Sequence, residues 1–173
     1  AIWCARHLIQ NEPFAVILAD DLIFGQSTTK EMIKNYNSGN MVAIMEVDKQ
    51  KVSSYGIVQV DSNDDDIVKI NQMIEKPSID NAPSNLAIVG RYILHNDIFK
   101  YIKKTKIGSG GELQITDAIL SSIKFNEIWG YKFNRKRYDC GNKIGFLKAQ
   151  IAVAFRDKKV RNEITEFIKS LGG

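Results

Sequence analysis

The sequence has few cysteines and prolines and no long hydrophobic run, and each shortage excludes a class of protein. Its 173 residues include 2 Cys and 3 Pro, and Cys4 and Cys140 form no CxxC pair, which argues against a disulfide framework and a thiolate metal site. No stretch approaches the roughly 18 uninterrupted apolar residues of a membrane span. Residues 1–10 lack the basic start and the cleavage site of a signal peptide. We therefore expect a cytoplasmic chain with free thiols and no membrane partner.

The charge pattern does not indicate a nucleic-acid-binding protein. The net charge is +4, but the lysines are scattered, and the densest basic group is the short segment at residues 134–137. With 44% apolar and 25% charged residues, the composition is ordinary for a soluble globular domain. We expect no nucleic-acid partner, and one domain or a large piece of one.

Short apolar runs predict an α/β fold with a mixed sheet. Residues 14–18 (FAVIL) are wholly apolar and end in Ala19-Asp20-Asp21, which predicts a strand buried on both faces, as in parallel sheets flanked by helices. Residues 56–60 and 67–74 flank a turn-rich segment at 61–66, which predicts an antiparallel hairpin and therefore a mixed sheet. Further strands are predicted at residues 41–47, 86–94 and 127–133.

Apolar residues at helical spacing predict the helices that flank this sheet. Thr28 and Glu31 have the spacing of a capping box, and the helix that they open is expected to stop near Gly39. A glycine-rich segment occupies residues 108–111. Residues 1–8 have an apolar helical face but no capping residue and no initiator methionine, so we expect the amino-terminal part of the protein to be missing. Further helices are predicted at residues 96–103, 113–123, 142–155 and 162–171.

Three aspartates are candidate metal ligands. Asp20 and Asp21 follow a predicted strand directly, and ligands of open α/β sheets gather at the carboxyl ends of strands. A carboxylate at this place can hold Mg²⁺ against phosphate oxygens, although an aspartate at a strand end also serves as a turn former or a helix cap. Asp139 precedes a tight turn into a helix and could either lend the metal a second carboxylate or cap that helix.

A second group of residues has the chemistry of a sugar-phosphate site. Glu75 could accept hydrogen bonds from sugar hydroxyls, Lys76 could contact a phosphate, and Pro77 would stiffen the exit of the strand. An exposed charge pair at a strand end remains an alternative for Glu75 and Lys76. Gly56 could bring the backbone close to a ligand, or could simply form a turn before a strand.

Six segments together resemble one enzyme family in order and spacing. The segments are PFAVILADD (13–21), YGIV (55–58), IEKP (74–77), APSNLAIVGRYIL (82–94), GELQITDAI (111–119) and YDCGNKIG (138–145). APSNLAIVGRY followed by GELQITDAI is far more specific than any single acidic motif. With these segments, the sequence resembles bacterial UTP–glucose-1-phosphate uridylyltransferases over almost its whole length.

The resemblance implies a cytoplasmic, Mg²⁺-dependent enzyme with a Rossmann-like α/β nucleotidyltransferase fold, and a homo-oligomer. Such an enzyme makes UDP-glucose and pyrophosphate from UTP and glucose 1-phosphate by in-line displacement at the α-phosphorus. Carried over by motif, Asp20 would hold Mg²⁺ and Asp139 would be a second metal ligand. Glu75 would bind glucose hydroxyls, Lys76 would contact the phosphoryl groups, and Gly56 would meet the sugar through its backbone.

The sequence departs from the family pattern in two ways. Ala19 stands where relatives often carry Gly or Pro. The larger departure is that the first strand of the family, its G-x-G-T-R loop with the following P-x-T-K, and the uracil-reading segment are expected to precede Ala1. Residues 1–173 would then be the sugar-phosphate- and metal-binding portion of a single nucleotidyltransferase domain truncated at its amino terminus. Without the missing phosphate loop, the chain alone is expected to bind UTP poorly and to be inactive.

Two other functions remain open. The chain could be a noncatalytic fragment that acts only in association. It could also derive from a thymidylyl- or cytidylyltransferase of another sugar phosphate, a class that shares the acidic strand end and the EKP turn but not the APSNLAIVGRY stretch.

Overall fold

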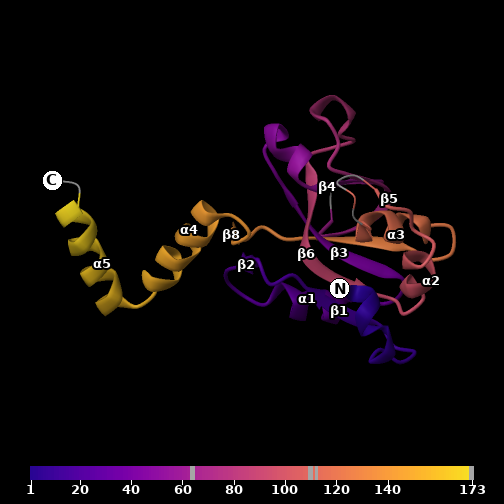
Figure 1. Cartoon of the computed structure of the whole chain (residues 1–173), viewed down its shortest axis with the longest axis horizontal. Helices are drawn as coiled ribbons and strands as arrows, with labels where there is room; N and C mark the ends of the chain where they lie inside the picture. The colour runs from indigo at the N-terminus through magenta and orange to yellow at the C-terminus, as the bar shows by residue number, and fades with distance from the viewer. Residues whose placement is uncertain (63–64, 109–110, 112, 172–173) are drawn as a thin grey trace. The chain divides into compact units, whose positions relative to one another are not determined.

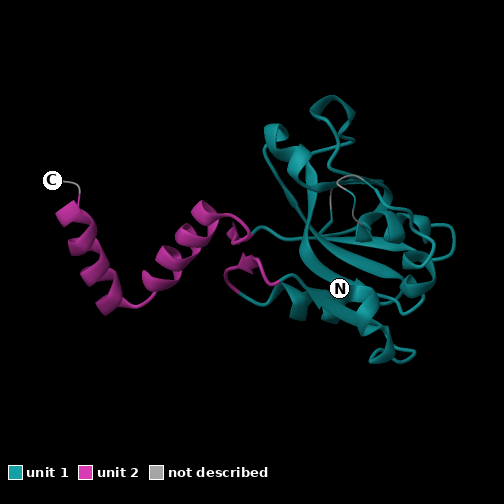
Figure 2. Ribbon diagram, viewed as in Figure 1, with its two compact units in different colours: residues 1–18, 26–134 teal, residues 19–25, 135–173 magenta. Residues whose placement is uncertain are grey.

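The structure divides into two compact units. It is a computed structural model, and it describes residues 1–62, 65–108, 111 and 113–171. Unit 1 comprises Ala1–Leu18 and Gln26–Asn134, and unit 2 comprises Ala19–Gly25 and Arg135–Gly173 (Figure 2). Parts of the predicted turn at 61–66 and of the glycine-rich segment at 108–111 lie outside the described residues.

Unit 1 is built on a mixed sheet, as the hairpin pattern predicted. Among the described residues the sheet has 6 strands in the order β1-β6-β3-β7-β5-β4. Figure 1 labels β1, β3, β4, β5 and β6. Strands β3 and β7 run parallel, and the other paired neighbours run antiparallel. The strands are β1 (Phe14–Ile17), β3 (Asn40–Glu46), β4 (Gly56–Val60), β5 (Ile67–Glu75), β6 (Leu86–Leu94) and β7 (Ile128–Lys132).

Helices pack onto this sheet and close the core of unit 1. Helix α1 contacts β6 and β3, and helix α3 contacts β5. Val42 and Ile44 on β3 belong to a buried cluster that includes Ile98 of α2 and Ile119 of α3. The helices are η1 (Ile2–His7), α1 (Thr28–Asn35), η2 (Lys49–Ser54), η3 (Ile79–Asn81), α2 (Ile98–Ile102) and α3 (Ile115–Ser121).

The predicted burial of residues 14–18 on both faces is wrong. Strand β1 lies at the edge of the sheet and pairs antiparallel with β6. Its side chains alternate between partly buried and exposed, and Ile17 is 56% exposed. Among the described strands, β3 and β6 are buried at nearly every position, so these interior strands are the ones covered on both faces. An apolar run alone does not reveal how many neighbours a strand will have.

The predicted capping box of helix α1 is also wrong in its first member. Ser27, rather than Thr28, is the N-cap, and its side chain accepts a hydrogen bond of 3.3 Å from the backbone N–H of Lys30. The helix ends at Asn35, several residues before the predicted stop. Gly39 has a φ of +74°, and a methyl group placed on it would lie 2.2 Å from the carbonyl oxygen of Glu127. Glycine is therefore required where the chain enters β3.

Unit 2 joins two short strands to two helices. Strand β2 (Asp21–Ile23) pairs antiparallel with β8 (Arg137–Asp139), and neither strand was predicted. Helices α4 (Lys143–Ala154) and α5 (Lys158–Leu171) lie close to their predicted positions. No helix within the described part of the chain combines the length and the apolar character needed to span a membrane.

Asn40 links three elements of unit 1 through its buried side chain. The side chain is inaccessible to solvent, and its Nδ2 donates to Ser122 Oγ at 3.0 Å at the end of α3. Its Oδ1 accepts from the backbone N–H of His95 at 3.0 Å, directly after β6. Ser122 Oγ in turn donates to the carbonyl oxygen of Ile119 at 2.6 Å. A buried polar group that loses such partners carries a large desolvation cost.

We therefore predict that Asn40→Ala lowers the free energy of unfolding by about 1 to 3 kcal/mol, because it leaves the partly buried N–H of His95 without its acceptor. Urea unfolding followed by circular dichroism measures this change. Asn35→Ala is the matched control, because Asn35 Nδ2 donates to Glu31 at 2.9 Å on the exposed surface of α1. Its effect should stay within about 0.5 kcal/mol. Equal losses in the two variants would contradict the role assigned to Asn40.

Candidate functional site

The predicted sugar-binding residues gather at one end of the β4–β5 hairpin. Gly56 is the first residue of β4, Glu75 is the last residue of β5, and the two are direct partners in the antiparallel register. The backbone N–H of Lys76 donates to the carbonyl oxygen of Tyr55 at 2.9 Å and continues the pairing by one step. The hairpin register therefore brings Gly56, Glu75 and Lys76 together.

Gly56 has no room for a side chain, because the carboxylate of Glu75 and the hydroxyl of Thr116 lie where its Cβ would be. A methyl group placed on Gly56 would lie 2.9 Å from Glu75 Oε2 and 3.2 Å from Thr116 Oγ1. The residue is buried and begins a strand, so the alternative of a simple turn is wrong. The carboxylate of Glu75 thus lies directly over bare backbone.

Lys76 has an unusual backbone conformation for its residue type. Its φ is 47°, in the left-handed region that costs an L-residue other than glycine about 1 kcal/mol or more. The N–H of Lys76 donates to Tyr55, and buried Pro77 is the next residue in the chain. The backbone of Lys76 is therefore fixed on its amino-terminal and its carboxy-terminal side. The Lys76 side chain is exposed. Strain of this kind clusters at functional sites, which agrees with a binding role for Lys76.

Thr116 belongs to the same group, although its role was not predicted from the sequence. Its Oγ1 donates to Glu75 Oε2 at 2.7 Å, and the residue is only 4% exposed. It lies in the first turn of α3, within the GELQITDAI segment. In the sequence, that segment was used only as evidence for the family. The other feature that could have indicated Thr116 is that a hydroxyl residue lies shortly after a glycine-rich segment.

The predicted metal ligands form a second group, which lies in unit 2. The backbone N–H of Cys140 donates to the carbonyl oxygen of Asp20 at 2.7 Å, and Asp139 Oδ1 accepts from the N–H of Gly141 at 2.9 Å. A methyl group placed on Gly141 would lie 3.1 Å from Asp20 Oδ2 and 3.1 Å from Asp139 Oδ1. Both carboxylates therefore lie beside the backbone of Gly141.

The two neighbouring aspartates, Asp20 and Asp21, have different roles. Asp21 is buried and forms an ion pair with Arg137, which commits its carboxylate to the β2–β8 pairing. Asp20 is exposed in the turn before β2, so its carboxylate is accessible to a ligand. The alternative role of Asp139 as a helix cap is wrong. Asn142 is the N-cap of α4, and its Oδ1 accepts from the N–H of Gly145 at 2.7 Å.

The donor set beside Gly141 suits one kind of metal. Within the described residues, no group of three or more His, Cys, Asp or Glu side chains could hold an ion. Structural zinc and calcium sites need more protein ligands than two carboxylates. Mg²⁺ is commonly held by one or two carboxylates, with substrate phosphates and water completing its shell. Asp20 and Asp139 therefore fit Mg²⁺ that arrives with a phosphate ligand.

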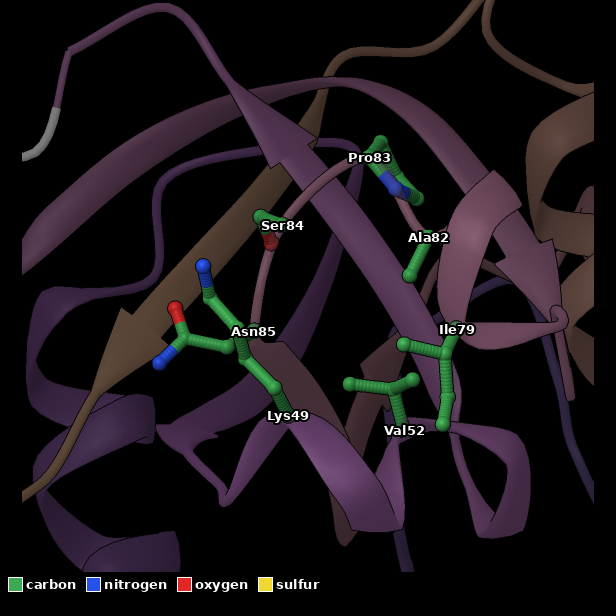
Figure 3. A pocket seen from close by; sticks show the side chains of 7 residues that line it. All are labelled: Lys49, Val52, Ile79, Ala82, Pro83, Ser84 and Asn85. Carbon is green, nitrogen blue, oxygen red and sulfur yellow. The ribbon is translucent and has the colours of Figure 1, made fainter.

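A nearby pocket does not involve the predicted site residues. It has a volume of about 350 Å³ and lies between η2 and η3, which flank the hairpin end in sequence (Figure 3). Two of its polar side chains are engaged in fixing the local backbone. Ser84 Oγ donates to the carbonyl oxygen of Val58 at 2.6 Å, and Asn85 Nδ2 donates to that of Val47 at 3.3 Å. We assign this pocket no ligand.

Comparisons with known proteins identify relatives of this chain. A UTP–glucose-1-phosphate uridylyltransferase of Staphylococcus saprophyticus is 42% identical over 99% of this chain and 61% of its own length. One of Pseudomonas aeruginosa is 47% identical over 86% of this chain and 55% of its own length. A crystal structure of UDP-glucose pyrophosphorylase complexed with UDP-glucose has a TM-score of 0.85 and 42% identity, over 90% of this chain and 61% of that chain. The chain thus spans less than two thirds of these relatives.

The family comparison covers both groups of candidate residues. The nucleotidyl transferase family matches residues 1–155, a range that includes Asp20, Gly56, Glu75, Lys76 and Asp139. The predicted fold class, a mixed sheet flanked by helices in a nucleotidyltransferase fold, is confirmed. The chain belongs to the nucleotidyl transferase family.

Proposed function

We propose that this chain is the sugar-phosphate- and metal-binding portion of a UTP–glucose-1-phosphate uridylyltransferase. In the proposed reaction, a phosphate oxygen of glucose 1-phosphate attacks the α-phosphorus of UTP. The bond from that phosphorus to the β-phosphate oxygen breaks, which gives UDP-glucose and pyrophosphate. The observation that carries the proposal is the hydrogen-bonded carboxylate of Glu75 over the bare backbone of Gly56. Hydroxyl groups of a sugar need acceptors that are held in place in this way.

The proposal divides the sugar phosphate between neighbouring residues of the hairpin end. Glu75 accepts hydrogen bonds from glucose hydroxyls, and the backbone at Gly56 approaches the sugar where no side chain intervenes. Lys76 is the adjacent cation and contacts the phosphate. Its exposed side chain and fixed backbone support this role. The chemistry is a displacement without a covalent enzyme intermediate, so these residues act by positioning and by balancing charge.

In this proposal Asp20 and Asp139 hold Mg²⁺. Bound there, the ion would neutralise negative charge on phosphate oxygens of the substrates. The two aspartates supply hard oxygen ligands, and Gly141 leaves the space between them free of a side chain. Arg137 keeps Asp21 in the β2–β8 pairing, which fixes the turn that carries Asp20.

Uridylyl transfer is favoured over the alternatives by the names of the relatives. The proteins at 42% and 47% identity are both named uridylyltransferases, and no observation favours a thymidylyl- or cytidylyltransferase of another sugar. The homo-oligomeric state and the cytoplasmic location remain predictions. The expected inactivity of the isolated chain also remains a prediction.

Because Glu75 is proposed to bind the sugar hydroxyls and Lys76 the phosphate, changing each residue should weaken ligand binding in a different way. Glu75→Gln should reduce the preference for glucose 1-phosphate over galactose 1-phosphate by about tenfold, because the amide offers a weaker and partly reversed hydrogen-bonding pattern. Lys76→Ala should weaken the binding of both sugar phosphates and of inorganic phosphate by about tenfold, because the lost group is a cation that contacts the phosphate. Titrations of the ¹⁵N-labelled chain, followed by NMR, measure these affinities.

Lys51→Ala is the matched control for Lys76, since Lys51 is an exposed lysine of η2. It should leave all three affinities unchanged. If Lys76→Ala changed only the choice of sugar, the roles of Glu75 and Lys76 would be wrongly assigned. If none of the three ligands perturbed the resonances of Gly56 and Glu75 in the unmodified chain, the proposed function would be wrong.

The metal assignment predicts that Asp20→Asn weakens divalent-cation binding beside Gly141 by about tenfold, because a neutral amide replaces a charged ligand. Mn²⁺ is a suitable probe, since it accepts the same oxygen ligands and broadens nearby NMR resonances. Broadening of the Gly141 amide should need a higher Mn²⁺ concentration in Asp20→Asn than in the unmodified chain. Asp157→Asn, which changes an exposed carboxylate before α5, should have no effect. Unchanged broadening in Asp20→Asn would remove Asp20 from the site.

A further inference from the structure

Thr116 uses its hydroxyl differently from two other hydroxyl residues that lie in helices. Ser121 Oγ of α3 donates to the carbonyl oxygen of Asp117 at 2.7 Å, and Thr165 Oγ1 of α5 donates to that of Arg161 at 2.8 Å. These bonds stay within the local turn of the chain. Thr116 Oγ1 instead donates at 2.7 Å to the side chain of Glu75, at the end of a strand that is distant in sequence. Its hydrogen bond therefore serves Glu75 rather than the helix.

The Thr116 hydroxyl does not cap helix α3, because it donates to Glu75. Gln114 occupies the N-cap position of α3, and its side chain makes no capping hydrogen bond. Thr116 lies inside the helix and is 4% exposed. A buried hydroxyl is costly unless it has a partner. For Thr116 the described residues provide that partner in the Glu75 carboxylate.

The contact also determines which hydrogen-bonding groups face a ligand. A threonine hydroxyl has one hydrogen to donate, and here Thr116 Oγ1 donates it in a hydrogen bond to Glu75 Oε2. The remaining lone pairs of the hydroxyl and the carboxylate can only accept hydrogen bonds. Gly56 lies against both groups, because a methyl group placed on it would meet Oε2 at 2.9 Å and Thr116 Oγ1 at 3.2 Å. The pair therefore forms a fixed set of acceptors over bare backbone.

We propose that Thr116 is a positioning residue that holds Glu75 in one rotamer and so sets the selectivity of the site for the sugar. This inference rests on the proposed function, in which Glu75 binds glucose hydroxyls. Thr116 acts through Glu75, whose carboxylate it orients before the ligand arrives. A carboxylate that is already oriented avoids the entropic cost of ordering a long side chain on binding.

Two variants separate the hydroxyl from the volume of the side chain. Thr116→Val keeps the shape and removes the hydroxyl, whereas Thr116→Ser keeps the hydroxyl. In the ligand-free chain, NMR scalar couplings of Glu75 should report one side-chain rotamer in the unmodified protein and in Thr116→Ser. In Thr116→Val they should report averaging among rotamers. If Glu75 kept one rotamer in Thr116→Val, the positioning role would be wrong, whatever the sugar affinities.

Ligand titrations then test the effect on selectivity. Thr116→Val should lose about tenfold in affinity for glucose 1-phosphate and keep its affinity for inorganic phosphate, and Thr116→Ser should retain both. Ser121→Ala, which removes a hydroxyl of the same helix that bonds to its own backbone, is the control and should change neither affinity.

The outcomes distinguish this inference from the proposed function. Equal affinity of the unmodified chain and Thr116→Val for glucose 1-phosphate would overturn the positioning role and leave the proposed function intact. An equal loss for glucose 1-phosphate and for phosphate would show a general structural defect and would also overturn it. If the unmodified chain bound inorganic phosphate but showed no added affinity for glucose 1-phosphate, the proposed function would fail, and the selectivity role of Thr116 with it.

Discussion

The antiparallel register of β4 and β5 places Gly56 opposite Glu75, and the candidate sugar site depends on this pairing. Side chains alternate along a strand, so a slip of one residue would move Glu75 to the other face of the sheet. Helix α3 then determines how the carboxylate is held, because Thr116 at its start donates to Glu75. The other end of α3 is fixed by the buried hydrogen bond between Asn40 and Ser122. The geometry of the site thus follows from the register of one hairpin and the docking of one short helix.

The candidate metal ligands depend on a different pairing. Strands β2 and β8 are very short, and the register places Asp21 opposite Asp139. The ion pair between Asp21 and Arg137 lies within this two-stranded sheet. It engages the carboxylate of Asp21, the second of the two adjacent aspartates. Asp20 is left exposed, with Gly141 beside it. An acidic pair in the sequence therefore separates into one structural carboxylate and one accessible carboxylate.

Much of the fold could be predicted from local patterns, and the exceptions have physical reasons. The hairpin at residues 56–75 was predictable because its two runs flank a turn-rich segment. The edge position of β1 could not be predicted, because a wholly apolar run does not show how many neighbouring strands will pair with it. Strands β2 and β8 have three residues each, too few for a period, and exist only through pairing over a long sequence separation. The choice of Ser27 over Thr28 as a cap depends on backbone geometry that adjacent hydroxyl residues do not reveal.

The candidate site was predictable in its residue types but not in its contacts. Glu75, Lys76 and Gly56 were identified from their chemistry and from the resemblance, and the structure brings them together. Thr116 was missed because its partner lies on another element, 41 positions away. A tertiary contact of this kind leaves no local pattern in a single sequence.

The most direct test of the account is the formation of UDP-glucose by a chimeric enzyme. Residues 1–173 would replace the matching segment of the Staphylococcus saprophyticus relative, whose remaining length would supply the rest of the active site. Labelled glucose 1-phosphate with UTP and Mg²⁺ should yield labelled UDP-glucose with the folded chimera, and none with the 173-residue chain alone. A folded chimera that formed no UDP-glucose, or an isolated chain that matched it in activity, would contradict the account.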